Sequence, residues 1–301
     1  MTTQLPAALS GERVEFTSAA GRLSMYVAGQ GPPLLIIHSV NAAGSAAEMR
    51  PLHDQYSASH TVFSIDLPGF GFSERSDRVY TPRLMTDAVH AFTDHIRARC
   101  GSTPIDALAL SLSCEYLARA AAEKPALYRS LALVSPTGFM GKRALRGAAD
   151  STRGQHWLYK ILRGPGTGWG SAVFRGLTKP GVIRYFLERT WGSKDIDEAL
   201  WAYAVLTTQA AGAHFAPLHF IAANLFSADI HTVYERLNGP VWMSHGVRGD
   251  FTDYRGKVIV EHRANWQFTV FPCGAMPYFE VPEDFCKAYD LFLSAPSWLK
   301  S

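Results

Sequence analysis

Short apolar runs alternate with helix-length segments along the first 135 residues of this 301-residue chain. We expect strands at 14–16, 23–28, 33–38, 61–66, 105–110 and 130–135, and helices at 46–56, 81–98 and 114–123. The run 33–38 is apolar along most of its length, which suits a strand buried on both faces. The alternation predicts the α/β class, a mostly parallel central sheet flanked by crossover helices.

The alternation stops between residues 140 and 238, where the sequence becomes helical in pattern, rich in aromatic residues and punctuated by glycine. We interpret 140–238 as a helical cap inserted into a core formed by 1–139 and 239–301. The core then resumes with expected strands at 240–245 and 267–271 and expected helices at 255–262 and 282–293. The aromatic residues of the cap favour an apolar ligand chamber beneath it.

Composition excludes several classes of function. The net charge is +3, with basic and acidic residues interspersed, so no nucleic-acid partner is expected and a small-molecule ligand is favoured. The N-terminal residues lack a signal-peptide pattern and the apolar run 34–37 is too short for membrane insertion, which predicts a cytoplasmic protein. The four cysteines show no CxxC spacing and are expected to be reduced thiols. The oligomeric state stays open.

Ser111 lies where an apolar strand passes directly into a helix, in the sequence Ala109-Leu-Ser-Leu-Ser113. A sharp turn at such a junction exposes a serine hydroxyl above the sheet, the geometry of a nucleophile elbow. The usual pattern is G-x-S-x-G, and here the small residues Ala109 and Ser113 replace both glycines. The alternative is an ordinary strand-to-helix junction with a serine N-cap.

Two loops at neighbouring strand ends complete this region. His38-Ser-Val40-Asn begins a loop of small residues, and in a hydrolase such a loop supplies one backbone N–H of an oxyanion hole. We predict Val40 and Leu112 as the two donors, with a plain connecting loop as the alternative. The segment 66–73, DLPGFGFS, forms a tight turn that is expected to shape the site rather than to react.

Together these motifs resemble the α/β-hydrolase superfamily, in its capped, cofactor-independent serine hydrolase branch. The resemblance implies the α/β-hydrolase fold with an inserted helical cap, Ser111 as the serine nucleophile, and no cofactor or metal. It also implies an acid at Asp250, in the sequence SHGVRGD, with Asp253 as a weaker candidate. In this fold the triad order is serine, acid, histidine.

The triad is incomplete, because Ala275 occupies the position of the expected histidine. The family frame G-H-x-P-x-x-E-x-P reads GAMPYFEVP at 274–282, and the last histidine of the chain is His262. A serine hydroxyl is a poor nucleophile without an adjacent base, and loss of a triad member can lower turnover by about 10⁴ to 10⁶.

Four explanations of Ala275 remain. A histidine was replaced deliberately; a natural protein lost catalysis and kept a ligand pocket; another base, His245 or His38, substitutes; or Cys114 or Tyr278 assists chemistry that needs no triad base. A thiol at a helix N-terminus, as expected for Cys114, can have a lowered pKa.

The sequence therefore predicts a hydrolase of the carboxylic-ester type or a C–C bond hydrolase. Its ligand is expected to be a small, largely apolar ester-like or carbonyl compound, and its incomplete triad predicts weak or altered activity. The alternative is a non-catalytic pseudoenzyme that binds a small ligand on the same fold.

Overall fold

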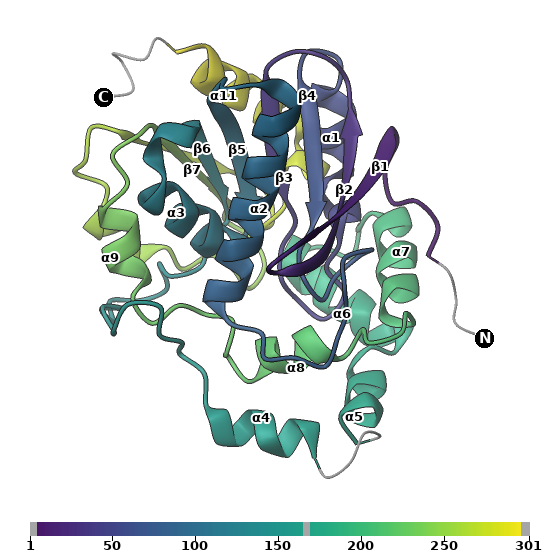
Figure 1. Ribbon diagram of the computed structural model, residues 1–301. Helices are drawn as coiled ribbons and strands as arrows, with labels where there is room; N and C mark the ends of the chain where they lie inside the picture. The colour runs from purple at the N-terminus through teal and green to yellow at the C-terminus, as the bar shows by residue number, and fades with distance from the viewer. Residues whose placement is uncertain (1–4, 165–168, 296–301) are drawn as a thin grey trace.

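The computed structural model describes residues 5–164 and 169–295, and its centre is an eight-stranded sheet (Figure 1). The strands are β1 (Glu12–Ser18), β2 (Gly21–Ala28), β3 (Pro33–Ile37), β4 (Thr61–Asp66), β5 (Ile105–Leu110), β6 (Tyr128–Val134), β7 (Val241–Gly246) and β8 (Trp266–Phe271). Their order is β1-β2-β4-β3-β5-β6-β7-β8. Strands β1 and β2 pair antiparallel, β2 pairs antiparallel with β4, and the remaining pairs are parallel. The predicted α/β class is confirmed.

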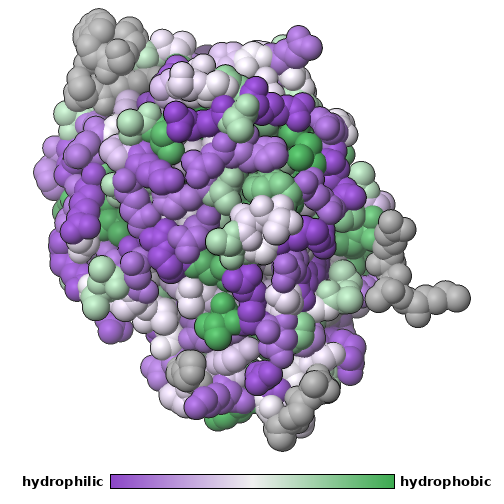
Figure 2. Space-filling view, viewed as in Figure 1, coloured by the Kyte–Doolittle hydropathy of each residue, from purple (hydrophilic) through white to green (hydrophobic). Residues whose placement is uncertain are grey.

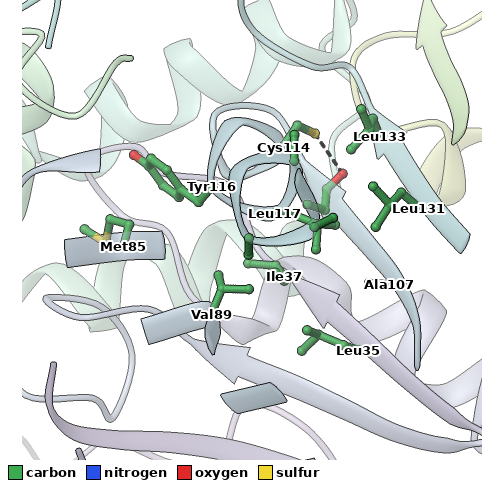
Figure 3. Close-up of a cluster of buried hydrophobic side chains, with 14 of the residues drawn as sticks. Leu35, Ile37, Met85, Val89, Ala107, Cys114, Tyr116, Leu117, Leu131 and Leu133 are labelled. Carbon is green, nitrogen blue, oxygen red and sulfur yellow. Dashed lines mark hydrogen bonds between the residues drawn. The ribbon is translucent and has the colours of Figure 1, made fainter. Parts of the chain in front are cut away.

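Alternate residues of the central strands pack on opposite faces of the sheet, as the pleat requires. Leu35 and Ile37 of β3 belong to a buried cluster that includes α2 (Pro82–Cys100) and α3 (Ser113–Glu123) (Figure 3). Leu34 and Ile36 belong to a second cluster that includes α1 (Arg50–Tyr56) and α11 (Pro282–Ser294). Burial on both faces explains why 33–37 is uninterruptedly apolar.

The chain between β6 and β7 forms helices α4 (His156–Arg163), α5 (Trp169–Leu177), α6 (Pro180–Trp191), α7 (Glu198–Thr208), α8 (Phe215–Ile221) and α9 (Ile230–Glu235). In Figure 1, α4, α5 and α8 lie below the sheet, beyond the end to which the arrow of β4 points. We call residues 140–238 the insert, of which 165–168 lie outside the described residues. On the face shown in Figure 2, hydrophobic side chains are scattered among hydrophilic ones.

Two expected helices differ in the structure. Residues 255–262 form only a short 3-10 helix, η3 (Arg255–Ile259), so the predicted helix was wrong over its second half. Gly256 lies against the backbone of Phe139, which leaves no room for a side chain there and fixes the segment by contact rather than by helix propensity. The helix expected over 46–56 begins as a 3-10 turn, η1 (Ala46–Met49), before α1.

Candidate active site

Ser111 occupies a strained turn between β5 and α3. Its φ angle is +57°, a left-handed conformation that costs a non-glycine residue about 1–3 kcal/mol. Its N–H donates to the carbonyl of Val134 at 2.8 Å, and its own carbonyl accepts from Cys114 N–H at 3.1 Å. Ala109 and Ser113, which replace the flanking glycines, are fully buried, so this packed turn has room only for small side chains.

Ser111 opens into a cavity of about 150 Å³ at the carboxyl end of the parallel strands. Its lining combines apolar and polar groups: Ser39, Val40, Asn41, Glu48, Leu110, Ser111, Leu112, Ser135, Thr137, Leu187, Thr190, Phe220, Phe226, Phe251, Ala275 and Met276. Leu187 and Thr190 come from α6, and Phe220 comes from α8, so the insert supplies part of the wall. A chamber of this size suits a small ligand.

Val40 and Leu112 both line this cavity beside Ser111. Neither backbone N–H has a hydrogen-bond acceptor among residues 5–164 and 169–295. Buried backbone N–H groups are nearly always hydrogen-bonded. Two unpaired N–H groups beside a strained serine are therefore suited to bind an oxygen atom of a ligand.

The loop that carries Val40 is held by Glu48, a buried carboxylate that also lines the cavity. Its Oε2 accepts the N–H of Ser39 at 2.7 Å, and its Oε1 accepts from Nδ2 of Asn41 at 2.8 Å. Burial raises the pKa of Glu48 from its ordinary 4.5 to about 7, although these hydrogen bonds act to lower it. Glu48 is thus a titratable group inside the chamber, poised near neutral pH.

Ala275 lies in the cavity wall and its side chain has no functional group. Its N–H donates to the carbonyl of Thr190 at 2.9 Å, and its carbonyl accepts from the hydroxyl of Ser135 at 2.7 Å. The backbone segment that would carry the histidine is therefore fixed against the end of α6 and against the end of β6.

Asp250 does not line the cavity and instead pairs with Arg189 of α6 at the protein surface. One carboxylate oxygen accepts from Nη2 of Arg189 at 2.7 Å and the other accepts from its Nε. The N–H of Asp250 also donates to the carbonyl of Arg189 at 3.0 Å. Asp253, the weaker candidate, pairs with Arg255. The structure thus brings Ser111, Val40, Leu112 and Ala275 together and leaves both acids outside.

The two histidines considered as substitute bases have other contacts. Nε2 of His38 accepts the N–H of Leu67 at 3.0 Å, so its Nδ1 carries the proton and donates to the carbonyl of Ser39. Nδ1 of His245 lies 2.9 Å from the carbonyl of Gly246, and its ring stacks on Tyr254. Burial lowers the pKa of both rings, and neither lines the cavity.

Cys114 and Tyr278 do not line the cavity either. The thiol of Cys114 lies in the buried cluster under α3, where burial raises its pKa well above the usual value (Figure 3). A thiol pKa can fall at a helix N-terminus, but here desolvation outweighs the helix dipole. The hydroxyl of Tyr278 is buried without a hydrogen-bond partner among the described residues and does not line the cavity.

Glu48 and Arg189 are the groups that sequence reasoning missed. A signal for Glu48 exists, because it stands as a single charge in the otherwise apolar run Ala46-Ala-Glu-Met49. Nothing in the sequence indicates that Arg189, 61 residues before Asp250, would engage that carboxylate.

Within the described ranges, no cluster of three or more histidine, cysteine, aspartate or glutamate side chains is arranged to hold a metal ion. No helix there combines the length and the apolar character needed to span a bilayer.

Comparisons with known proteins agree with this fold. Residues 34–288 match the model of the alpha/beta hydrolase family. Searching by sequence among curated proteins found no match. Many solved structures share the fold, and one is the enol-lactonase from Burkholderia xenovorans LB400, with a TM-score of 0.71 and 14% identity over 94% of this chain and 100% of that one.

A serine hydrolase involved in carbazole degradation, the CarC enzyme, has a TM-score of 0.70 and 17% identity over 94% of this chain and 99% of that one. The epoxide hydrolase CorEH has a TM-score of 0.70 and 19% identity over 94% and 98%. At these identities the neighbours establish the fold alone. The family match covers most of the chain, and the chain belongs to the alpha/beta hydrolase family.

Proposed function

We propose that the protein is a carboxylic-ester or C–C bond hydrolase that acts on a small, largely apolar carbonyl compound through Ser111. The observation that carries this proposal is the strained φ of Ser111 beside the open N–H groups of Val40 and Leu112. The strained backbone of Ser111 destabilises the folded protein, and such strain is typical of a turn that presents a nucleophile to a carbonyl carbon.

In this account the carbonyl carbon lies over Ser111 Oγ, and the carbonyl oxygen accepts from the N–H groups of Val40 and Leu112. These donors are in place before the substrate arrives, so they stabilise the developing oxyanion without reorganisation. Phe220, Phe226 and Leu187 provide the apolar surface for the rest of the substrate. Because Ala275 supplies no base, turnover is expected to be slow.

Hydrolysis of p-nitrophenyl esters tests this function. The wild type is expected to hydrolyse the acetate slowly and in preference to the octanoate, because the longer acyl chain needs more room in the chamber that Ser111 lines. Ser111→Ala should abolish this turnover. Ser113→Ala is the matched control, since Ser113 lies in the same elbow but its hydroxyl donates to the carbonyl of His38 and does not line the cavity. Equal turnover in the wild type and Ser111→Ala would contradict the proposal.

A second candidate function is non-catalytic binding of a small carbonyl ligand. The observation that favours it is the engagement of Asp250 with Arg189, together with the absence of a histidine at 275. In that case a small alkyl boronic acid or ester binds in the chamber, as calorimetry can measure, while no ester turnover depends on Ser111.

A further inference from the structure

We infer that Glu48 is the general base of this site, taking the proton of Ser111 and returning it to the leaving group. The inference rests on the proposed function, since it supplies the proton acceptor that Ala275 cannot. It assigns a reaction role to a residue outside the serine, acid and histidine positions of the family pattern.

The first support is placement. Glu48 and Ser111 both line one chamber of about 150 Å³. A carbonyl compound bound over Ser111 Oγ lies in the chamber that Glu48 also lines, and in this proposal the proton passes directly or through one water. Among the described residues that line this chamber, Glu48 is the one whose side chain ionises near neutral pH.

The second support is orientation. Glu48 is buried, and its two oxygens each accept one hydrogen bond from the loop that presents Val40. A carboxylate oxygen has two lone pairs, so each keeps one acceptor position after these contacts. The loop therefore fixes the carboxylate while leaving it able to accept another proton.

The third support is the charge balance of the step. In the ground state the carboxylate of Glu48 carries one negative charge. As Ser111 Oγ bonds to the carbonyl carbon, its proton passes to Glu48, and the single negative charge moves to the carbonyl oxygen. The buried chamber never holds two negative charges, which a low-dielectric site would resist strongly. Glu48 then protonates the departing group as the carbon–leaving-group bond breaks.

Water completes the cycle by the same route. Glu48 takes a proton from a water molecule whose oxygen bonds to the acyl carbon, and that proton passes to Ser111 Oγ as the ester bond breaks. The products are the acid and the free serine, so atoms and charges balance. No oxidant, metal or second reactant is needed.

The groups around Glu48 do not titrate in the same pH range as its carboxyl group. Burial raises the pKa of Tyr278, on the neighbouring helix α10 (Pro277–Glu280), well above its usual value, with a contribution from the charge of Glu48. The pKa of His38 is lowered by burial, so its ring is neutral. The charged groups of Arg50 and Asp66 have other partners. Arg50 pairs with Asp197 at 2.8 Å, and Asp66 accepts the N–H of Ala46 at 2.8 Å.

The test is the pH dependence of kcat/KM for p-nitrophenyl acetate between pH 5 and 9. The wild type is expected to rise with pH through an inflection at about 7, because the base must lose its proton first. Glu48→Gln should lower kcat/KM at pH 8 by about 10²-fold, the lower end of what a positioned base contributes, and remove the inflection.

Two further variants distinguish a Glu48 that acts as the base from a Glu48 that only supports the loop carrying Val40. Asn41→Ala removes a hydrogen bond that lowers the pKa of Glu48, so it should keep the inflection and move it to higher pH. Glu115→Gln is the matched control, since Glu115 is also a buried carboxyl with a raised pKa but does not line the cavity. It should leave the position of the inflection unchanged.

An inflection that persists in Glu48→Gln overturns the inference, as does an inflection that Asn41→Ala leaves in place at its wild-type pH. If Glu48→Gln fails to fold, as judged by circular dichroism, the Asn41→Ala profile decides alone. Wild-type turnover that survives Ser111→Ala overturns the proposed function together with this inference, so the two failures are distinguishable.

Discussion

At the scale of single residues, the site combines a strained Ser111 with an Asp250 that lies outside the cavity and an alanine at position 275. Ser111 is held in a strained turn, whereas the carboxylate of Asp250 binds Arg189 outside the cavity. The elbow was predictable because a buried strand running directly into a helix leaves a turn at Ser111. The position of Asp250 was not, because its partner Arg189 lies in the insert, and a motif does not show which distant side chain a carboxylate meets.

Restoring a histidine tests how much of the triad remains. Ala275→His should raise kcat/KM for p-nitrophenyl acetate by about 10²-fold, since a positioned base contributes about 10² to 10⁴. The gain should fall short of the full range because Arg189 holds Asp250. Arg189→Ala added to Ala275→His should raise the rate further, whereas Arg189→Ala alone should not. No gain from either histidine-bearing variant would show that the chamber cannot accommodate the ring productively.

The titration of Glu48 should also make the free energy of unfolding depend on pH. Burial raises its pKa from 4.5 to about 7, so its protonated form favours the folded state below pH 4.5, and this contribution is lost as the pH rises through 7. The loss amounts to about 3 kcal/mol at 1.36 kcal/mol per pKa unit. Urea unfolding should measure the free energy of unfolding of Glu48→Gln minus that of the wild type. This difference should increase by about 3 kcal/mol from pH 4 to pH 8, because the wild type loses this stability and the variant does not.

Glu123→Gln provides a control of opposite sign for this measurement. Burial acts to raise the pKa of Glu123, but hydrogen bonds from Arg83 and His90 outweigh it, and the pKa is lowered. The contribution of Glu123 is therefore present above its unfolded pKa and is lost as the pH falls. A pH-independent difference between Glu48→Gln and wild type would contradict the titration assigned to Glu48.

At the scale of elements, buried polar contacts join the insert to helix α3. Glu115 accepts from Arg153 and from the N–H of Ser227 at 2.7 Å. One turn further along α3, Arg119 forms an ion pair with Asp229, and both side chains are 6% exposed. The sequence predicted a helix over 114–123, but these charged contacts depend on how the insert folds back, which a local pattern does not contain.

The Arg119–Asp229 pair yields a stability prediction. Arg119→Met should destabilise the protein by about 3–5 kcal/mol, because it leaves the carboxylate of Asp229 buried without its partner. The double variant Arg119→Met/Asp229→Leu should recover most of this loss, since well-packed apolar residues often replace a buried pair at little cost. Chemical denaturation measures both. A double variant as unstable as the single one would show that the pair also determines how the insert packs.

At the scale of the whole molecule, the burial of the central sheet was accessible from the sequence, whereas the side chains that the insert contributes to the chamber were not. The uninterrupted apolar strand 33–37 indicates burial on both faces, and the structure confirms this. The wall of the chamber includes Leu187, Thr190 and Phe220, whose placement follows from tertiary packing of the insert.

We propose that this member of the alpha/beta hydrolase family retains a reactive serine at Ser111 although alanine occupies position 275, where the family pattern has its histidine. Intact-mass analysis after treatment with a small fluorophosphonate, followed by peptide mapping, tests this most directly. We expect a single adduct on Ser111, formed faster at pH 8 than at pH 6 and absent from Ser111→Ala. An unmodified wild-type protein, or an adduct on another residue that persists in Ser111→Ala, would contradict it.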